Sequence, residues 1–439
     1  MDMKLVAMGA TVALVVAGIG TYLVVDHDAD DSPDGGDFKL GNLTVLGNAD
    51  NDDDLDNDDV SKIEEVIASG SWDKSKNPLA DANNDGRVDA DDVSYLRNLM
   101  KRSEADPTVM YYYNSWNEIG SLRFPVTGNI GAMYWEQADL SILLGLWDRV
   151  KAVGYGSLNE IKNPGWESLY SYGKGYNAEP EVVAKSNREA GVTAVIAYIQ
   201  SDGSAKEIDT YLKGTQSPID LVCLPLSMNA RVVTGGVLFC AEERSEKYMS
   251  YQNQVIDYMS EKLSKVKDAP TCVTIMMKAD TSTSNIRFLN MSVNGESNGL
   301  YTYMRDSPSK VYVVEPTSSY ATHTDIEWLN SKNPDWILCC SSGAWKSGNT
   351  REQNQVQFDQ ECKDWFSSTT AYSKRQIIGT ANGTMNSFFG CFAYLKLLSF
   401  MYDEIDVAYA NEVMQKFFDE GFAYFNLENM PNYQFYRVS

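Results

Sequence analysis

The sequence predicts an α/β protein built from two similar lobes, which a long helix joins and a small, acidic, all-α module precedes. Three observations indicate this architecture. Apolar runs of strand length alternate with helical stretches beyond residue 116. An unbroken helical pattern occupies 235–267, between two regions of this kind. Two acidic segments of twelve residues, 48–59 and 81–92, come before them.

The first element is an apolar N-terminal segment. Residues 5–25, "LVAMGATVALVVAGIGTYLVV", carry no charge and follow Lys4. A helix of this length spans a hydrocarbon layer of roughly 30 Å, whereas the apolar core of a secretory signal has about 7–15 residues. The following "VVDHD" is a poor cleavage site, so 1–25 is predicted to be an uncleaved membrane anchor, with a cleaved signal as the alternative. The rest of the chain is then expected outside the cell.

Charge and composition exclude several classes of function. The chain has 439 residues and a formal charge of −24, and residues 26–106 hold 23 acidic and 8 basic side chains. Such a surface disfavours nucleic acid as a partner. The two histidines cannot build a histidine-based metal or acid–base centre, and none of the seven cysteines forms a C-x-x-C pair. No nucleophile–base pair is visible, so we expect a protein that is not an enzyme.

The acidic segments have the spacing of calcium-binding loops. "DANNDGRVDADD" (81–92) places side-chain oxygens at positions 1, 3, 5, 9 and 12, a main-chain carbonyl at position 7 and Gly86 at the turn. "NADNDDDLDNDD" (48–59) repeats the pattern with Asp53 in place of the glycine, so we expect its site to be weaker. A divalent cation in each loop relieves the repulsion among its carboxylates. The predicted ligands of two Ca²⁺ ions are Asn48, Asp50, Asp52, Asp54, Asp56 and Asp59 in the first loop, and Asp81, Asn83, Asp85, Arg87, Asp89 and Asp92 in the second, with Asp54 and Arg87 binding through their carbonyls.

Each loop leads into a short amphipathic helix, and position 12 is Asp rather than the Glu of an ordinary EF-hand. In this respect residues 47–101 resemble a type I dockerin. The resemblance implies calcium-dependent docking to a cohesin-type protein through positions 10 and 11, which are Asn57–Asp58 and Ala90–Asp91 here. The alternative is a disordered acidic linker.

Residues 26–46 and 102–116 are polar or turn-rich and are expected to be linkers. Beyond them, continuously apolar runs suit parallel strands that are covered on both faces. The candidate strands are 123–127, 193–199, 220–224, 271–277, 310–315, 336–340 and 376–380.

The pattern at 235–267 has no internal glycine or proline after its first two residues and predicts one rigid helix of roughly 45 Å. Similar helix–strand–loop units lie on each side of it. We therefore expect a Rossmann-like N-lobe at 117–234 and a Rossmann-like C-lobe at 268–439.

The order of several motifs carries a second resemblance. These are "ADLSILLGLWDRVKAVGYG" (138–156), "GGVLFCAEERSEKYMSY" (235–251), "NPDWILCC" (333–340) and "LKLLSFMYDEID" (395–406). Over about 117–435 the chain resembles the substrate-binding proteins of ABC importers for iron–siderophore complexes and vitamin B12. The resemblance implies a ligand between two lobes, a rigid helical connection and docking onto a membrane permease.

Ligands of open α/β sheets bind beyond the carboxyl ends of the strands, so the loops there are expected to line the cleft. The candidate cleft residues are Asn129, Tyr134, Trp135, Ser201, Asn229, Arg231, Ser341, Trp345 and Asn382. The aromatic side chains among them could instead pack within a lobe, and Arg231 could form an ion pair. The resemblance also implies one acidic residue on each lobe that meets the permease. These are Glu327 in the C-lobe and Glu181 in the N-lobe, where the equivalent register falls on Lys185.

The sequence thus favours a surface-anchored receptor of an ABC importer that captures a metal chelate or corrinoid. One alternative is a cell-surface assembly or adhesion protein whose lobes bind a glycan or a protein partner. A more remote one is a chelatase-like enzyme, since two-lobed α/β folds host enzymes as well.

Overall fold

The computed structural model describes residues 39–155, 165–174, 178–197, 202–264, 266–267, 270–277, 286–289, 312–313, 321–324, 326–341, 349–381, 384, 387–423 and 434–439. Within these ranges, no helix combines the length and the apolar character needed to cross a bilayer. The anchor predicted at 1–25 lies outside the described residues.

The acidic module consists of two loops and two helices, α1 (Asn57–Ala68) and α2 (Ala90–Lys101). Each helix begins with a reciprocal capping box, Asp56 with Asp59 in α1 and Asp89 with Asp92 in α2, which satisfies main-chain N–H groups of the first turn. The apolar faces of the two helices meet in a small core that includes Val60, Ile63, Val93 and Leu96. The repeated sequence pattern thus yields a repeated structure.

A hairpin follows the module. Strands β1 (Thr108–Tyr113) and β2 (Ile119–Phe124) pair antiparallel. Val45 forms an isolated antiparallel bridge to Tyr112 on the other edge of β1. The prediction of a linker at 102–116 is therefore wrong, because Met110, Tyr112 and Tyr113 of β1 are buried. The described end of the other predicted linker, residues 39–46, also packs rather than crossing solvent.

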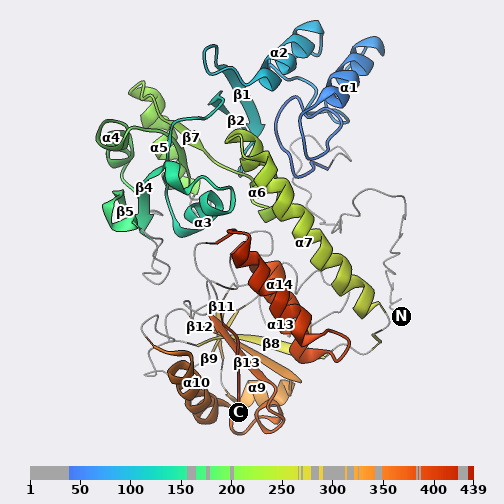
Figure 1. Cartoon of the computed structure of the whole chain (residues 1–439), viewed down its shortest axis with the longest axis vertical. Coiled ribbons are helices and arrows are strands. Elements are labelled where there is room, and N and C mark those ends of the chain that lie inside the picture. The colour runs from blue at the N-terminus through green and yellow to red at the C-terminus, as the bar shows by residue number, and fades with distance from the viewer. Residues whose placement is uncertain are drawn as a thin grey trace, which may run out of the picture. The chain divides into compact units, whose positions relative to one another are not determined.

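The N-lobe contains a five-stranded parallel sheet in the order β5-β4-β3-β6-β7. Figure 1 labels β4, β5 and β7 of this sheet. Its strands are β3 (Asn129–Ala132), β4 (Val150–Tyr155), β5 (Tyr170–Lys174), β6 (Val192–Ile196) and β7 (Asp220–Val222). Its helices are α3 (Trp135–Leu143), α4 (Pro180–Ala190) and α5 (Asp202–Gly214), with short 3-10 turns η1 (Trp147–Arg149) and η2 (Trp166–Ser168). The expected parallel α/β arrangement is present.

The single rod expected at 235–267 is wrong, because two helices occupy this region: α6 (Met228–Leu238) and α7 (Glu242–Leu263). Cys240 lies between them in the left-handed conformation, with φ 54°. The Cys240 N–H donates to the carbonyl of Val237, and the Ala241 N–H donates to that of Gly236. These two bonds form a Schellman motif, which ends a helix although the side-chain pattern continues.

The C-lobe sheet has the order β11-β9-β8-β12-β13-β14, and β10 also pairs with β8. Its centre is parallel: β8 (Thr271–Met277), β12 (Trp336–Ser341) and β13 (Ile377–Ala381). The other strands are β9 (Ile286–Leu289), β10 (Tyr312–Val313), β11 (Ala321–Thr324) and β14 (Tyr436–Arg437). Helices α9 (Ile326–Lys332), α10 (Arg351–Phe366) and α11 (Thr370–Ser373) belong to the same lobe.

Two further helices, α13 (Gly390–Met401) and α14 (Val407–Asp419), pack against α7. The Tyr251 hydroxyl of α7 donates to the carbonyl of Val413 at 2.8 Å, and its ring stacks on Phe392 with centroids 5.1 Å apart. One continuous apolar core joins these helices to residues of both sheets, such as Ile196 and Leu338. The connecting helix is therefore bound to the C-terminal helices along its length.

Candidate functional site

The second acidic loop is wound around its own side chains. Asp81 accepts the N–H groups of Asp85 and Gly86, at 3.0 and 2.9 Å. Asn83 accepts the N–H of Asp85, and Asp85 accepts that of Arg87. At the far end, the two oxygens of Asp92 accept the N–H groups of Asn83 and Asp89, at 3.2 and 2.8 Å. The side chain at position 1 thus binds the middle of the loop, and the side chain at position 12 bridges positions 3 and 9.

The first loop repeats this arrangement at equivalent positions. Asn48 and Asp50 both accept the N–H of Asp52. The oxygens of Asp59 accept the N–H groups of Asp50 and Asp56, at 3.3 and 3.0 Å. Positions 1 and 12 are buried in both loops: Asn48, Asp59, Asp81 and Asp92. Hydrogen bonds to the side chains at positions 1 and 12 therefore hold both loops in a similar closed conformation.

The loops differ at position 6. Gly86 has φ 87°, and no atom lies within 4 Å of the place where a Cβ would stand. Asp53 is not among the residues with positive φ, although the sequence predicted that it tolerates such a conformation. Its carboxylate instead accepts from the side-chain amide of Asn42 at 3.2 Å. The first loop thus turns without a left-handed residue at this position.

The carboxylates of the first loop destabilise one another's charged forms. Burial, together with the charges of Asp52, Asp56 and Asp50, raises the pKa of Asp54 to about 6. Burial likewise raises the pKa of Asp59 to about 8. Among the described residues, no three carboxyl, thiol or imidazole groups are already gathered closely enough to hold a metal ion. The residue types and the turns suit a hard cation, and its binding requires these side chains to converge.

A second polar cluster lies where β3 ends and α3 begins. Arg231 of α6 and Glu136 of α3 form an ion pair of 3.5 Å whose side chains are 3% and 8% exposed. The Arg231 Nε also donates to the carbonyl of Pro225 at 3.0 Å. Burial raises the pKa of Glu136, and Arg231 opposes that shift. Arg231 is therefore a buried ion-pair partner rather than a surface cation.

Asp139 stands one turn after Glu136 on α3. Burial raises the pKa of its carboxyl to about 8, and the Glu136 charge adds to that shift. Glu136 and Asp139 were not among the predicted site residues, because they lie inside an apolar helical pattern that is typical of packing within a lobe. Their spacing of three residues was the available signal, since it puts both on one face of a helix.

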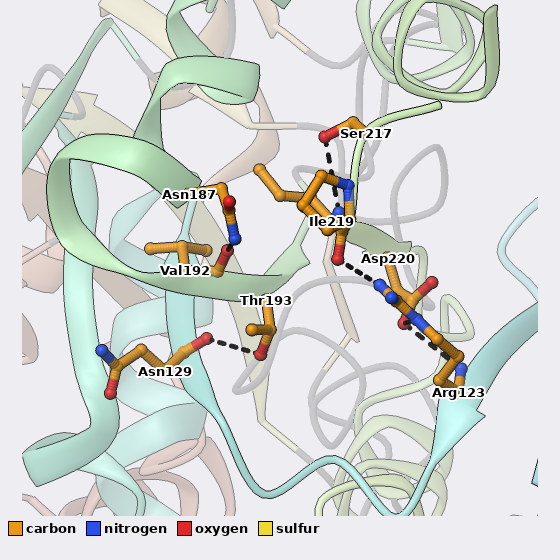
Figure 2. Close-up of polar contacts among 9 residues, drawn as sticks. Arg123, Asn129, Asn187, Val192, Thr193, Ser217, Ile219 and Asp220 are labelled. Atoms are coloured by element: carbon orange, nitrogen blue, oxygen red, sulfur yellow. Dashed lines mark hydrogen bonds and ion pairs between the residues drawn. The ribbon is translucent and has the colours of Figure 1, made fainter. Parts of the chain in front are cut away.

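Asn129 does not lie at the carboxyl edge where the sequence placed it. It begins β3, and its side-chain amide donates to the carbonyl of Ala190 at 3.1 Å. Figure 2 shows it beside Thr193 of β6, whose hydroxyl donates to the Asn129 carbonyl. The prediction was wrong because β2 ends just before Pro125 and β3 begins at Asn129. Asn129 therefore opens β3 instead of lying in the loop after a strand.

The other candidate cleft residues that the structure describes make contacts within the protein. Tyr134 is 9% exposed and lies in the apolar cluster of the N-lobe, with its ring centroid 6.1 Å from that of Trp135. Trp135, the first residue of α3, is half-buried. The Asn229 side chain accepts a hydrogen bond from Gln252 of α7 at 2.9 Å. Ser341 ends β12, while Ser201, Trp345 and Asn382 lie outside the described residues.

The two glutamates suggested for permease docking occupy equivalent places in the two lobes. Glu181 is the second residue of α4, which precedes β6, and Glu327 is the second residue of α9, which precedes β12. Each of these strands lies inside its sheet between two parallel neighbours. Both side chains are exposed. Lys185 lies one turn further along α4 and is also exposed, so Glu181 matches Glu327 better in topology.

No protein-family model matches this sequence, and no curated protein matches it. Solved structures do resemble the fold. The TroA-like periplasmic binding protein FepB from Veillonella parvula aligns with a TM-score of 0.56 and 13% identity, over 75% of this chain and 99% of that one.

Two other solved structures align less well. The petrobactin-binding protein YclQ from Bacillus subtilis has a TM-score of 0.45 and 13% identity, over 72% of this chain and 99% of that one. IsdE of S. aureus, solved with heme, has a TM-score of 0.43 and 14% identity, over 63% and 99%. The similarity to the V. parvula protein shows that this chain has the α/β fold of TroA-like periplasmic binding proteins.

Proposed function

We propose that the protein is the exported solute-binding receptor of an ABC importer and captures an iron–siderophore complex, a heme-like chelate or a corrinoid. The observation that carries this proposal is the fold, which aligns with a periplasmic binding protein over 75% of this chain and 99% of that protein's length. Each lobe has a parallel sheet centre whose carboxyl edge can face a ligand. The chain is then a binding protein rather than an enzyme, and the alternative is a surface protein whose lobes bind a glycan.

The ligand in this proposal is a complete chelate rather than a bare metal ion. The sequence holds only two histidines, His27 and His323. Imidazole is a side chain that suits iron and zinc, so two histidines offer little for a direct Fe³⁺ or Zn²⁺ site. The half-buried Trp135 at the start of α3 instead offers an aromatic face. In this proposal Trp345 would add a second aromatic face, and Ser201, Ser341 and Asn382 would supply polar groups.

In this proposal the exposed Glu181 and Glu327 contact basic residues of the permease, one from each lobe. Their equivalent positions at the starts of α4 and α9 support a symmetric mode of docking. Residues 1–25 would hold the receptor at the membrane. Charge reversal of either glutamate should weaken binding to the permease and leave ligand binding unchanged.

We further propose that each acidic loop binds one Ca²⁺ ion. Asn48, Asp50, Asp52, Asp56 and Asp59 with the Asp54 carbonyl would hold the first ion, and Asp81, Asn83, Asp85, Asp89 and Asp92 with the Arg87 carbonyl the second. The matched turns of the two loops and the burial of positions 1 and 12 support this assignment. A cohesin-type partner would meet the exposed Asn57–Asp58 or Ala90–Asp91.

Isothermal titration calorimetry of residues 39–439 with siderophores, heme and cobamides tests the receptor proposal. We expect one ligand class to bind with 1:1 stoichiometry, while free Fe³⁺ and Zn²⁺ bind weakly. Trp135→Ala should weaken binding by about 1–3 kcal/mol if its ring contacts the ligand. Trp72→Ala, in the acidic module, is the matched control and should leave affinity unchanged. Binding of bare metal with no response to any chelate would refute the proposal.

A further inference from the structure

The segment that precedes the first acidic loop is built into the N-lobe. Leu43 and Val45 are fully buried and belong to the same apolar core as Met110, Tyr112 and Val237. The Tyr113 N–H donates to the carbonyl of Thr44 at 2.8 Å, and the Leu46 N–H donates to that of Tyr111 at 2.9 Å. Residues 44–46 therefore act as a third strand on the free edge of β1.

Thr44 also connects this segment to α6. Its N–H donates to the hydroxyl of Thr234 at 3.1 Å, and that hydroxyl donates to the carbonyl of Asn42 at 2.9 Å. Thr234 has no exposed surface and lies in α6, 190 residues after Thr44 in the sequence. One buried hydroxyl thus satisfies a donor and an acceptor of residues 42–44.

The same segment holds three positions of the first loop. The side-chain amide of Asn48, at position 1, donates to the carbonyl of Leu43 at 2.8 Å. The Gly41 N–H donates to the side chain of Asn51 at 2.8 Å, and Asn42 donates to Asp53. Residues 41–46 are therefore bonded to the first acidic loop on one side, and to β1 and α6 on the other.

The second half of the module has its own connections. The Tyr95 hydroxyl of α2 donates to the carbonyl of Val109 in β1. Arg102, which follows α2, forms an ion pair of 2.6 Å with Glu242, the first residue of α7. The Gly47 N–H donates to the carbonyl of Leu79, just before the second loop. The helix that follows the second loop is thus bonded to β1 and α7, which an autonomous docking module does not require.

From these contacts we infer that the acidic module is an integral part of the N-lobe, and that cation binding in its loops stabilises β1, residues 40–46 and α6. The inference rests on the calcium binding proposed above. When the carboxylates converge on an ion, Asn48 and Asp53 become fixed, and their bonds to Leu43 and Asn42 are fixed with them. Residues 44–46 and Thr234 carry this constraint into the lobe.

Hydrogen–deuterium exchange of the full chain, with Ca²⁺ or with a chelator, tests the inference. We expect amide exchange to slow about tenfold in both loops and also in 40–46, β1 and α6. Calorimetry of the same protein separates the two proposals. Absence of calcium binding would overturn the calcium assignment, whereas binding that protects only 48–59 and 81–92 would overturn the coupling.

Thr234→Val provides a sharper version of this test, since it removes the linking hydroxyl at nearly constant volume. Calcium should still bind in the loops, while the protection of α6 should be lost. Thr210→Val is the matched control, because the Thr210 hydroxyl bonds only within α5 to the carbonyl of Lys206. Equal calcium-dependent protection of α6 in both variants would contradict the proposed route. If Thr234→Val does not fold, the exchange pattern of the unaltered protein still decides the question.

Discussion

Arg231 of α6 and Glu136 of α3 form a buried ion pair with 3.5 Å between Nη1 and Oε2. Removing one member of such a pair leaves the other charge buried without its partner, which typically costs about 3–5 kcal/mol. We therefore expect Arg231→Met to lower the free energy of unfolding by about 3 kcal/mol at pH 7. Urea titration followed by circular dichroism measures this loss.

The matched control is the double variant Arg231→Met with Glu136→Leu, which removes both charges. It should recover most of the lost stability, because replacing a buried pair by apolar residues is often neutral. A double variant as unstable as Arg231→Met would contradict the view that the unpaired carboxylate causes the loss.

Asp139 should make stability depend on pH. Its pKa of about 8 in the folded protein lies above the ordinary 3.8, so the unfolded chain loses this proton first as pH rises. The aspartate therefore lowers stability progressively between about pH 4 and pH 8, and the cost is constant above that. Asp139→Asn should be more stable than the unaltered protein at pH 8.5, by about 1–3 kcal/mol, with a smaller difference at pH 5. Melting temperatures at the two pH values test this, and an equal difference at both would exclude the titration of Asp139.

The sequence predicted the strands of this fold well, because burial on both faces leaves a continuous apolar run. The segment 271–277 coincides with β8, and 336–340 and 376–380 each differ from β12 and β13 by one residue. These features depend on local composition, which a single sequence contains.

Features that leave no signal in the local composition were not predicted. The break between α6 and α7 relies on a left-handed Cys240, a residue type that does not favour this conformation. The packing of Leu43 and Val45 into the N-lobe depends on the free edge of β1. The Arg231–Glu136 pair joins residues 95 positions apart. Only the folded chain brings these groups together.

Arg244 near the start of α7 connects three helices. Its guanidinium donates to the carbonyl of Leu143 at the end of α3, at 3.1 Å, and to those of Glu420 and Gly421 after α14, at 2.9 and 2.8 Å. Because a lysine cannot reproduce this fork of donors, Arg244→Lys should cost about 1–2 kcal/mol and speed amide exchange at the end of α14. Lys247→Arg is a nearby control that keeps its ion pair with Glu420. Unchanged exchange in Arg244→Lys would argue against this connection.

Lys396 of α13 is a buried ammonium, 9% exposed, that lies 4.7 Å from the centroid of the Phe400 ring. Burial lowers its pKa to about 8, and Arg351 contributes in the same direction. The unfolded chain keeps this proton up to about pH 10.5, whereas the folded protein loses it near pH 8. The buried charge therefore lowers the free energy of unfolding by its full amount below pH 8. This loss of stability disappears as the pH rises to about 10.5. Lys396→Met should therefore raise stability by about 1–3 kcal/mol at pH 7 and by less at pH 10. Thermal unfolding at both pH values measures the difference, and a variant that is less stable at pH 7 would show that the ammonium is structurally required.

The two acidic loops should differ in calcium affinity, because Gly86 takes its left-handed turn without strain and Asp53 has no such conformation. We expect Asp81→Ala with Asp85→Ala to abolish the tighter of two sites in calorimetry, and Asp50→Ala with Asp52→Ala to abolish the weaker. Gly86→Ala keeps every ligand and adds a strained side chain at φ 87°, so it should weaken only the tighter site, by about 1–2 kcal/mol. Gly70→Ala is its control, since Gly70 also has positive φ but follows α1, outside both loops. If Gly86→Ala and Gly70→Ala had equal effects on calcium affinity, the difference would reflect general backbone strain, and the ranking of the two loops would be wrong.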